Sequence, residues 1–420
     1  MPEVSLEQLN RMIDQLNAKL QENEEKLKRL TADLPSLEAA IKEIDSEIRF
    51  TRVHVSADHV ADNKIMLLQG WVPEANEQDI RHYLEFQEVY YIIEDPQPED
   101  DVPIQFANNK FVKLFEPITE MYMLPKYNEL DLTPFFAPFY MIFFGLSLGD
   151  IGYGLFLFLA ATIVKVVKKK SLGMTLKNVL SLVQVLGAST VVCGLLTGGF
   201  FGFNIYEVNI PFFQNMKNHV YFDNNQMFEL SLILGVVQIM FGMFLKIINR
   251  TKQFGFKHAL ATVGWFIFLL SFIVAYLFPV ALPMLGTVHQ IILLGSAILF
   301  LFFNSPGKNL FLNFGLGLYD IYNMATGLLG DVLSYVRLFA LGLSGGILAS
   351  VFNSLATGMS PKDSIIGPLV TIVIFVIGHA INIFMDTLGA VVHPMRLTFV
   401  EFYKNAEFTG GGKKYNPFRK

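Results

Sequence analysis

The stretch FFAPFYMIFFGLSLGDIGYGLFLFLAATIVKVV, residues 135–167, decides the fold class of this chain. Asp150 and Lys165 are its only charged residues, and a helix needs about 20 consecutive apolar residues to cross the hydrocarbon core of a bilayer. The whole chain has 420 residues, of which 52% are hydrophobic and 16% are charged, whereas soluble domains average about 25% charged residues. We therefore predict a mostly α-helical integral membrane protein.

Apolar runs of this kind continue to Val400 and predict a polytopic helix bundle. The expected spans lie near residues 134–148, 150–168, 177–203, 227–248, 257–281 and 287–303, and two longer, tilted helices follow near 316–356 and 363–404. The first pair has a second interpretation, one long helix, which would reduce the number of spans from eight to seven.

The distribution of basic residues favours eight spans. With eight, the N-terminal domain lies on the same side of the membrane as the C-terminal tail and the loops that contain KVVKKK, NRTKQFGFK and SPGKN. The opposite loops contain only Lys217 and Lys362 as basic residues. The positive-inside rule then places both termini in the cytoplasm, whereas seven spans would put the soluble domain on the side opposite KVVKKK.

Residues 1–50 have the heptad pattern of a coiled-coil arm. Apolar residues recur at alternating spacings of three and four, interrupted only by Asn23: Leu6, Leu9, Ile13, Leu16, Leu20, Leu27, Leu30, Leu34, Leu37, Ile41, Ile44 and Ile48. One helix cannot bury this seam alone, so we expect a second strand from another chain or from a segment outside this sequence.

Residues 51–110 are expected to form a small α/β cytoplasmic lobe and a linker. KIMLLQGWV (64–72) and EVYYIIE (88–94) have the composition of strands, and EANEQDIRHYLEFQ (74–87) that of a helix. DPQPEDDVP (95–103) is a linker rich in proline and acid. Residues 111–420 then form the transmembrane ion-channel domain with a short cytoplasmic tail.

Several function classes are disfavoured by the composition. The net charge of −5 gives no indication of nucleic-acid binding, and Cys193, the single cysteine, excludes an intrachain disulfide and a multi-cysteine metal site. SPGKN lacks the spacing of a P-loop, and no GxGxxG follows a strand. We therefore expect no cofactor, no metal and no nucleotide site in this chain.

Arg337 is a permanent positive charge within SYVRLFALGLSGG, residues 334–346, and its insertion at bilayer depth costs roughly 2.5–3.5 kcal/mol. A snorkelling or salt-bridged structural arginine is the alternative interpretation. Asp331 is six residues away, so the two side chains diverge on a helix and an ion pair would need another helix. Arg337 belongs to a polar or small stripe with three- and four-residue spacing: Asp320, Asn323, Gly327, Gly330, Ser334, Arg337, Leu341 and Ser344. Close packing of helices explains the glycines, but not the polar residues.

The last long helix carries a second stripe, which consists of His379, Asn382, Asp386, Gly389, His393 and Arg396. Such a stripe is expected to face a water-filled path or a matching stripe on another helix. The two arginines suit an ion pathway in which a mobile carboxylate passes them. A permanent cation stabilises the ionised carboxylate, so the carboxylate releases its ion there, and the same charge blocks a direct leak.

The sequence around these residues resembles that of the membrane subunit of rotary V-type and A-type ATPases, which is called subunit a in eukaryotes and subunit I in prokaryotes. The resemblance rests on PFFAPFYMIFFGLSLGDIGYGL, SYVRLFALGLS, HPMRLTFVEFYKN, the tail YNPF and GWVP at residues 70–73. It implies that Arg337 and Arg396 are the two channel arginines and that Asp386 is the acid that accompanies them. Gly345 differs from some relatives, which have histidine there. The family's usual N-terminal segment is also missing from this sequence, and the short loops are more similar to the prokaryotic form.

The resemblance implies a non-catalytic stator subunit of a rotary ATPase or ATP synthase that provides two half-channels for H⁺ or Na⁺. The implied partners are a ring of hairpin proteolipids (c/K subunits), peripheral-stalk subunits of the E/G type, the central stalk and catalytic head, and the lipid of a prokaryotic cell membrane. A proton-coupled secondary transporter and a purely structural tether are the alternatives. Besides Arg337 and Arg396, the expected ion-pathway residues are Asp386, His379, Asn382, His393, Ser334, Ser344, Asp320 and Glu229.

Overall fold

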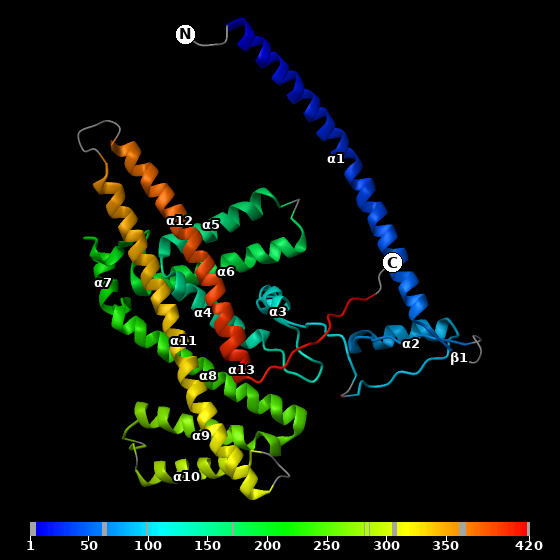
Figure 1. Cartoon of the computed structure of the whole chain (residues 1–420), viewed down its shortest axis with the longest axis vertical. Coiled ribbons are helices and arrows are strands. Elements are labelled where there is room, and N and C mark those ends of the chain that lie inside the picture. The colour runs from blue at the N-terminus through cyan, green and yellow to red at the C-terminus, as the bar shows by residue number, and fades with distance from the viewer. Residues whose placement is uncertain are drawn as a thin grey trace. The chain divides into compact units, whose positions relative to one another are not determined.

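The computed structural model describes residues 6–60, 65–97, 100–169, 172–280, 282–284, 286–304, 309–360 and 367–417. The chain divides into two compact units (Figure 1). One unit extends to Pro96 and includes the C-terminal residues from Tyr415, and the other is Gln97–Lys414. Helices dominate both units, as the composition predicts.

The first unit begins with α1 (Leu6–Ser56), a single helix that continues through Pro35. Pairs of oppositely charged side chains four residues apart, such as Lys26 and Glu22 at 2.7 Å, support it along the surface. The apolar seam is exposed: Leu27 is 65% and Leu30 69% accessible. Within the described part of the chain no second helix covers this seam, so the coiled-coil pairing stays a prediction.

The rest of this unit is a short hairpin and one helix. β1 (Asp58–Val60) pairs with β2 (Ile65–Leu67) in antiparallel register, and α2 (Glu77–Phe86) follows a 3₁₀ turn, η1 (Glu74–Asn76). The prediction of a strand at residues 88–94 is wrong, because Glu88 lies in a turn and residues 89–94 form no strand pairing with the described residues. The partner of β2 is instead the short segment that directly follows α1.

The second unit contains eight apolar helices at the eight ranges expected from hydropathy. Their bounds are α4 (Thr133–Leu148), α5 (Ile151–Val167), α6 (Met174–Thr197), α8 (Asn224–Phe254), α9 (Phe256–Leu277), α10 (Thr287–Phe302), α11 (Leu310–Gly358) and α12 (Gly367–Arg396). Five of them, α6, α8, α9, α11 and α12, have the length and composition of membrane spans, whereas α4, α5 and α10 are shorter. The prediction of several helices long and apolar enough to cross a membrane is confirmed, and the number of eight spans stays a prediction.

The first apolar pair is two helices and not one. Gly149 ends α4 in the left-handed conformation, with φ of 52°, which glycine adopts without steric cost. Asp150 then caps α5, because its side chain accepts a hydrogen bond from the backbone N–H of Tyr153. Gly149 therefore ends α4, and Asp150 begins α5.

Short elements complete the second unit. They are η2 (Val112–Leu114), α3 (Glu116–Tyr122), the hairpin β3 (Gly199–Phe200) and β4 (Phe203–Asn204), η3 (Ile205–Glu207), α7 (Pro211–Val220), the π-helical turn η4 (Leu397–Phe402) and α13 (Tyr403–Asn405). The π-helical turn directly continues α12, so the last apolar segment changes its helical geometry just after Arg396.

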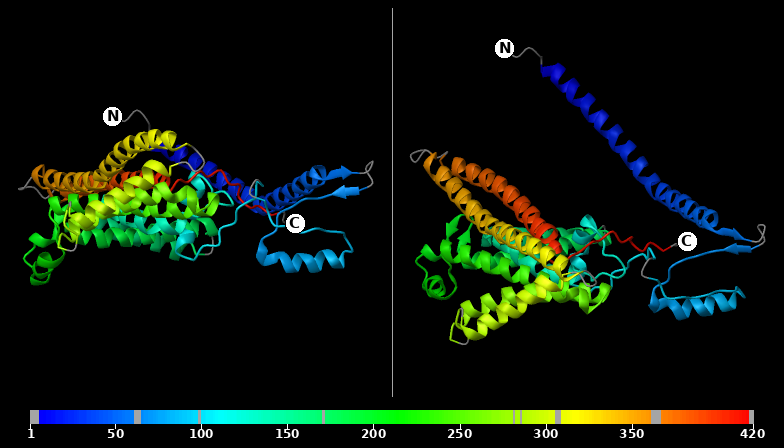
Figure 2. Two further views of the ribbon diagram at one scale, coloured as in Figure 1. Left: turned by 90° about the horizontal axis from the view of Figure 1, so that it is seen from below. Right: turned by 60° about the horizontal axis from the view of Figure 1, so that its bottom comes forward.

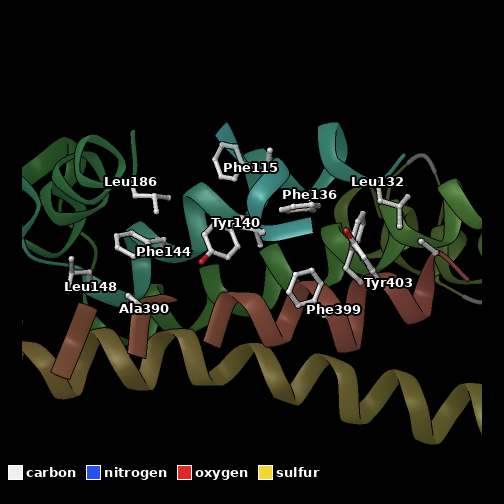
Figure 3. Close-up of a cluster of buried hydrophobic side chains, with 14 of the residues drawn as sticks. Phe115, Leu132, Phe136, Tyr140, Phe144, Leu148, Leu186, Ala390, Phe399 and Tyr403 are labelled. Carbon is white, nitrogen blue, oxygen red and sulfur yellow. The ribbon is translucent and has the colours of Figure 1, made fainter. Parts of the chain in front are cut away.

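The core of the unit lies around α4. Phe136, Tyr140 and Phe144 are almost fully buried and pack with Phe115 and Tyr403 from the segments before and after the bundle (Figure 3). Aromatic side chains of this size bury the largest apolar area per residue. Small residues bring α5 and α6 together, since a Cβ on Gly154 would lie 2.8 Å from the carbonyl oxygen of Gly187.

The two long helices α11 and α12 lie side by side and form a layer over one side of the bundle (Figures 1 and 2). Tyr335 and Leu338 attach α11 to the core through a second buried cluster with α4, α8 and α9. One face of α12 is apolar and exposed, since Phe384 is 67% and Leu388 53% accessible.

Candidate ion-pathway site

Arg337 is half-buried in the middle of α11 and forms no ion pair with a carboxylate of the described residues. Its Nη1 atom is buried and has no hydrogen-bond partner among them. Asp331 binds Lys404 instead, with Nζ–Oδ distances of 2.8 and 3.0 Å. The divergence of Asp331 and Arg337 expected from their spacing is therefore confirmed.

Arg396 ends α12 and is exposed, and His393 lies one turn before it. The charges of both Arg337 and Arg396 act on His393, whose Nδ1 is buried and without a hydrogen-bond partner in the described part of the chain. The structure thus brings three of the expected site residues, contributed by α11 and α12, into one electropositive group.

Asp386 packs directly against the backbone of α11. An added Cβ on Gly345 would lie 2.6 Å from Oδ2 of Asp386, which is closer than real side chains approach. This Oδ2 atom is buried and accepts no hydrogen bond from the described residues. Asn382, one turn earlier, donates to the carbonyl oxygen of Gly345 at 3.1 Å. Because Gly345 has no side chain, the polar stripe of α12 contacts α11 at this point.

His379 belongs to a buried hydrogen-bond chain. Asn353 donates through Nδ2 to the carbonyl oxygen of Phe201 at 2.7 Å, so its Oδ1 faces Nε2 of His379 at 2.9 Å. Nε2 must then carry the hydrogen, and Nδ1 accepts from the hydroxyl group of Tyr153 at 2.8 Å. Both ring nitrogens have partners, which fixes one neutral tautomer of His379.

The same chain continues to Asn382, which donates to the Tyr153 oxygen at 2.9 Å. Asp150 supports its other end, because its carboxylate accepts from the N–H groups of Tyr153, Phe201 and Gly202 at 3.0–3.1 Å. The β3–β4 hairpin, α5, α11 and α12 therefore meet at one connected polar network. His379 and Asn382 hold this network, and Asp386 lies one turn beyond them.

Asp320 lies apart from this group. Its Oδ2 accepts from Nε1 of Trp265 on α9 at 2.9 Å. It lines a cavity of about 210 Å³ between α8, α9, α11 and the end of the chain's last apolar segment. The polar residues that line this cavity are Lys246, Arg250, Thr262, Asn304, Asp320, Asn323, Lys404 and Asn405. A cavity of this size and polarity can hold several water molecules.

Three other expected residues are not brought into either group. Ser334 and Ser344 each donate to a carbonyl oxygen of their own helix, at 3.0 and 2.9 Å. Glu229 is exposed near the beginning of α8. No interaction in the described structure links these three side chains to the arginines.

Sequence reasoning missed Glu401, a buried acid that lies in the π-helical turn after Arg396 and is 2% exposed. The motif FVEFYKN contains it, but a single acid near a basic tail has the pattern of an ordinary interfacial residue. The described residues contain no group of three His, Cys, Asp or Glu side chains that could hold a metal ion.

Comparison with known proteins identifies similar sequences across most of the chain. The model of the V-type ATPase 116kDa subunit family matches residues 3–196 and 326–420, so the second matched range contains Arg337, Asp386 and Arg396. Among curated proteins, A-type ATP synthase subunit I of Methanocaldococcus jannaschii is 32% identical over 386 residues, covering 84% of this chain and 54% of the relative.

Two bacterial proteins are also similar to this chain over most of its length. V-type ATP synthase subunit I of Borreliella burgdorferi is 27% identical, covering 90% of this chain and 64% of the relative. V-type ATP synthase subunit I of Chlamydia trachomatis is 25% identical, covering 99% of this chain and 71% of the relative. The chain thus spans roughly half to two thirds of the length of the first two relatives.

Proposed function

The chain belongs to the V-type ATPase 116kDa subunit family, and we propose on this basis that it is the membrane stator subunit of a rotary A/V-type ATPase or ATP synthase. The names of its relatives, A-type and V-type ATP synthase subunit I, support membership of such a complex. In this role α11 and α12 face a ring of hairpin proteolipids, and peripheral-stalk subunits connect α1 to the catalytic head.

The observation that carries the proposal is the pair of arginines without carboxylate partners in the described structure. Arg337 and Arg396 come from adjacent long helices, and both act on His393. Their helices form one outer layer of the bundle (Figure 2). A structural arginine in a membrane is expected to be neutralised within its own chain, so this arrangement favours a carboxylate supplied by another chain.

A passing carboxylate would be strongly affected by such a cation. At a separation of about 4 Å and an effective dielectric constant of about 20, a guanidinium stabilises the ionised form by about 4 kcal/mol. The carboxylate therefore releases its H⁺ or Na⁺ on approach and remains ionised while it passes. Because a guanidinium does not lose its proton at ordinary pH, this effect holds throughout the cycle.

Polar groups on either side of the arginines support two separate half-channels. The α11–α12 pair is antiparallel, since Gly345 meets Asp386 whereas Leu341 meets Gly389. Asp386 and the His379 network lie toward the Gly358 end of α11, and the Asp320 cavity lies toward the Leu310 end. If both termini are cytoplasmic, the first region serves the outer half-channel and the second serves the cytoplasmic one.

Purification of the chain from its native membrane tests this assignment. We expect a ring of small hairpin proteolipids and an ATP-hydrolysing head to copurify with it in mild detergent, as identified by mass spectrometry and an ATPase assay. A proton-coupled secondary transporter would instead purify without them and would transport a solute after reconstitution alone. That second result would contradict the proposed stator function.

A further inference from the structure

The turn of the β3–β4 hairpin has a backbone conformation that its first residue does not favour. Phe201 and Gly202 connect the two strands, and both have positive φ, 47° and 73°. Glycine adopts this left-handed conformation readily, whereas a bulky aromatic residue seldom does. Asparagine, aspartate or glycine usually occupies the first position of such a two-residue turn. Phenylalanine at this position therefore indicates that contacts outside the hairpin hold the turn.

The carboxylate of Asp150 supplies two of these contacts. Its Oδ1 atom accepts a hydrogen bond from the N–H group of Phe201 at 3.0 Å, and its Oδ2 atom accepts one from Gly202 at 3.1 Å. The backbone of Asp150 also forms an isolated parallel bridge with Gly199 at the beginning of β3. Side-chain and backbone hydrogen bonds therefore fix the hairpin to the beginning of α5.

The ring of Phe201 packs between α5 and α12. Its centroid lies 5.5 Å from the ring centroids of both Tyr153 and His379, and the ring planes are nearly perpendicular in each pair, at 81° and 87°. Phe375 on α12 lies 6.5 Å away by the same measure. A Cβ on Gly152 of α5 would lie 2.4 Å from the ring of Phe201. Because Gly152 has no side chain, the ring can enter this space.

The backbone of the same turn contacts α11. An added Cβ on Gly202 would lie 2.6 Å from the carbonyl carbon and from the Cβ of Ala349. One helical turn later on α11, Asn353 donates through Nδ2 to the carbonyl oxygen of Phe201 at 2.7 Å. The Phe201 carbonyl group thus determines which end of the Asn353 amide faces His379 on α12. A turn of two residues therefore contacts α5, α11 and α12.

Two hydrogen bonds join α11 and α12 close to this turn, and the turn acts on both. The first joins Asn353 to His379 at 2.9 Å, and Phe201 orients the Asn353 amide. In the second, Asn382 donates to the carbonyl oxygen of Gly345 at 3.1 Å. The same Nδ2 atom of Asn382 donates to the hydroxyl group of the Tyr153 side chain, against whose ring Phe201 packs. Displacement of the turn would therefore loosen both links between the two long helices.

We propose that Phe201 and Gly202 are positioning residues that fix α12 against α11 and so keep the Asp386 carboxyl group beside Gly345. The ring of Phe201 holds α12 through its contacts with His379 and Tyr153, and the backbone of the turn holds α11. The importance of this position for ion transport rests on the proposed function, whereas the fixing of the two helices does not.

Cysteine cross-linking of the assembled complex in lipid tests the effect on helix position. A Cβ on Gly378 of α12 would lie 3.0 Å from the Cβ of Phe352 on α11, and a disulfide needs a Cβ–Cβ distance of about 3.8 Å. Phe352→Cys with Gly378→Cys should therefore form a disulfide under mild oxidation. Mass spectrometry of the linked peptides distinguishes this pair from Cys193.

Addition of Phe201→Ala to this cysteine pair should slow disulfide formation severalfold. Alanine has a Cβ, as phenylalanine does, so the change removes the ring and leaves the backbone requirement of the turn unchanged. Phe203→Ala is the matched control, because Phe203 belongs to the same hairpin but is 53% exposed, and it should leave the rate unchanged. Equal rates with and without Phe201→Ala would overturn the proposal.

Ion pumping in reconstituted vesicles, expressed per assembled complex, tests the role in transport. We expect Phe201→Ala to reduce ATP-driven pumping severalfold and Phe203→Ala to retain the wild-type rate. Phe201→Leu, which keeps a large apolar side chain beside His379, should recover part of the rate. In the Phe201→Ala variant that carries the cysteine pair, oxidation should raise the rate, because the disulfide joins the helices that the ring no longer holds.

The outcomes separate this role from the proposed function. Wild-type pumping by Phe201→Ala alongside an inactive Arg337→Ala would refute the role of the turn in transport alone, as would a reduced rate that oxidation does not raise. Wild-type pumping by Arg337→Ala would refute the proposed function, and the cross-linking result for α11 and α12 would remain.

Discussion

Gly345 is a residue at which the contact between the two long helices depends on the absence of a side chain. Its Cβ would lie 2.6 Å from Oδ2 of Asp386 and 3.0 Å from Oδ1. Gly346, the next residue, has no atom within 4 Å of the same position. These two adjacent glycines therefore separate the effect of crowding Asp386 from the general effect of alanine in a helix.

We expect Gly345→Ala to displace the Asp386 carboxyl group and to reduce ATP-driven ion pumping severalfold. Gly346→Ala should leave the rate unchanged and, because alanine is favoured over glycine in a helix by about 1 kcal/mol, should leave the protein at least as stable. Pumping rates of the two variants in vesicles provide the comparison. Equal rates would show that the Asp386 position does not matter for transport.

At the residue scale the sequence indicated which polar side chains share a face but not what they contact. The stripes of α11 and α12 were readable from spacing alone. The partners of His379 were not, because Tyr153 is 226 residues away and the tautomer depends on Asn353 and the Phe201 carbonyl group. Asp320 belongs to the first stripe by spacing, yet Trp265 on another helix determines where its carboxylate lies.

At the scale of elements, the segment after the last apolar helix is anchored to α8. Glu407 binds Arg250 through two hydrogen bonds, one of them 2.6 Å long, and Lys246 lies 3.7 Å away. Burial alone would raise the pKa of the Glu407 carboxyl group, but the hydrogen bonds of Arg250 and the charges of Lys246 and Arg250 outweigh it, so the pKa is lowered.

A lowered pKa in the folded state makes this contact sensitive to acid. Its contribution to stability is fully present above the pKa of the unfolded chain and is lost as the pH falls through the lower folded value. We therefore expect the melting temperature of the wild type to exceed that of Glu407→Gln at pH 7, and this difference to shrink on acidification below about pH 4. A difference that is constant with pH would contradict the ion-pair account.

Helices in long apolar runs were predicted correctly from the sequence, whereas the strand at residues 88–94, which would need a partner strand, was not. All eight apolar ranges contain helices, because about 1.5 Å of rise per residue and a continuous apolar surface leave few other structures in hydrocarbon. Residues 88–94 have a strand composition, but no neighbouring edge is available to them in the described structure. Nothing in LTFVEF distinguishes a π-helical turn from an ordinary α-helix.

At the scale of the whole molecule, we propose that a helix from another chain or from a segment outside this sequence covers the exposed heptad seam of α1. Leu27→Ser with Leu30→Ser should weaken the attachment of peripheral-stalk subunits, because both leucines are exposed seam residues. Glu25→Ser with Lys28→Ser, off the seam of the same helix, is the matched control and should retain attachment. Quantitative mass spectrometry of the purified complexes measures both, and equal recovery of the stalk subunits would refute pairing through the seam.

The central claim for the whole molecule is that Arg337 faces a carboxylate on another chain during ion transport. The most direct measurement is ATP-driven ion pumping in vesicles that contain the complete complex with Arg337→Ala, with Arg81→Ala as a control for loss of an exposed arginine outside the bundle. We predict that Arg337→Ala abolishes pumping while the complex still assembles, that Arg337→Lys also fails to restore it, and that Arg81→Ala pumps normally. Full pumping by Arg337→Ala would contradict the account.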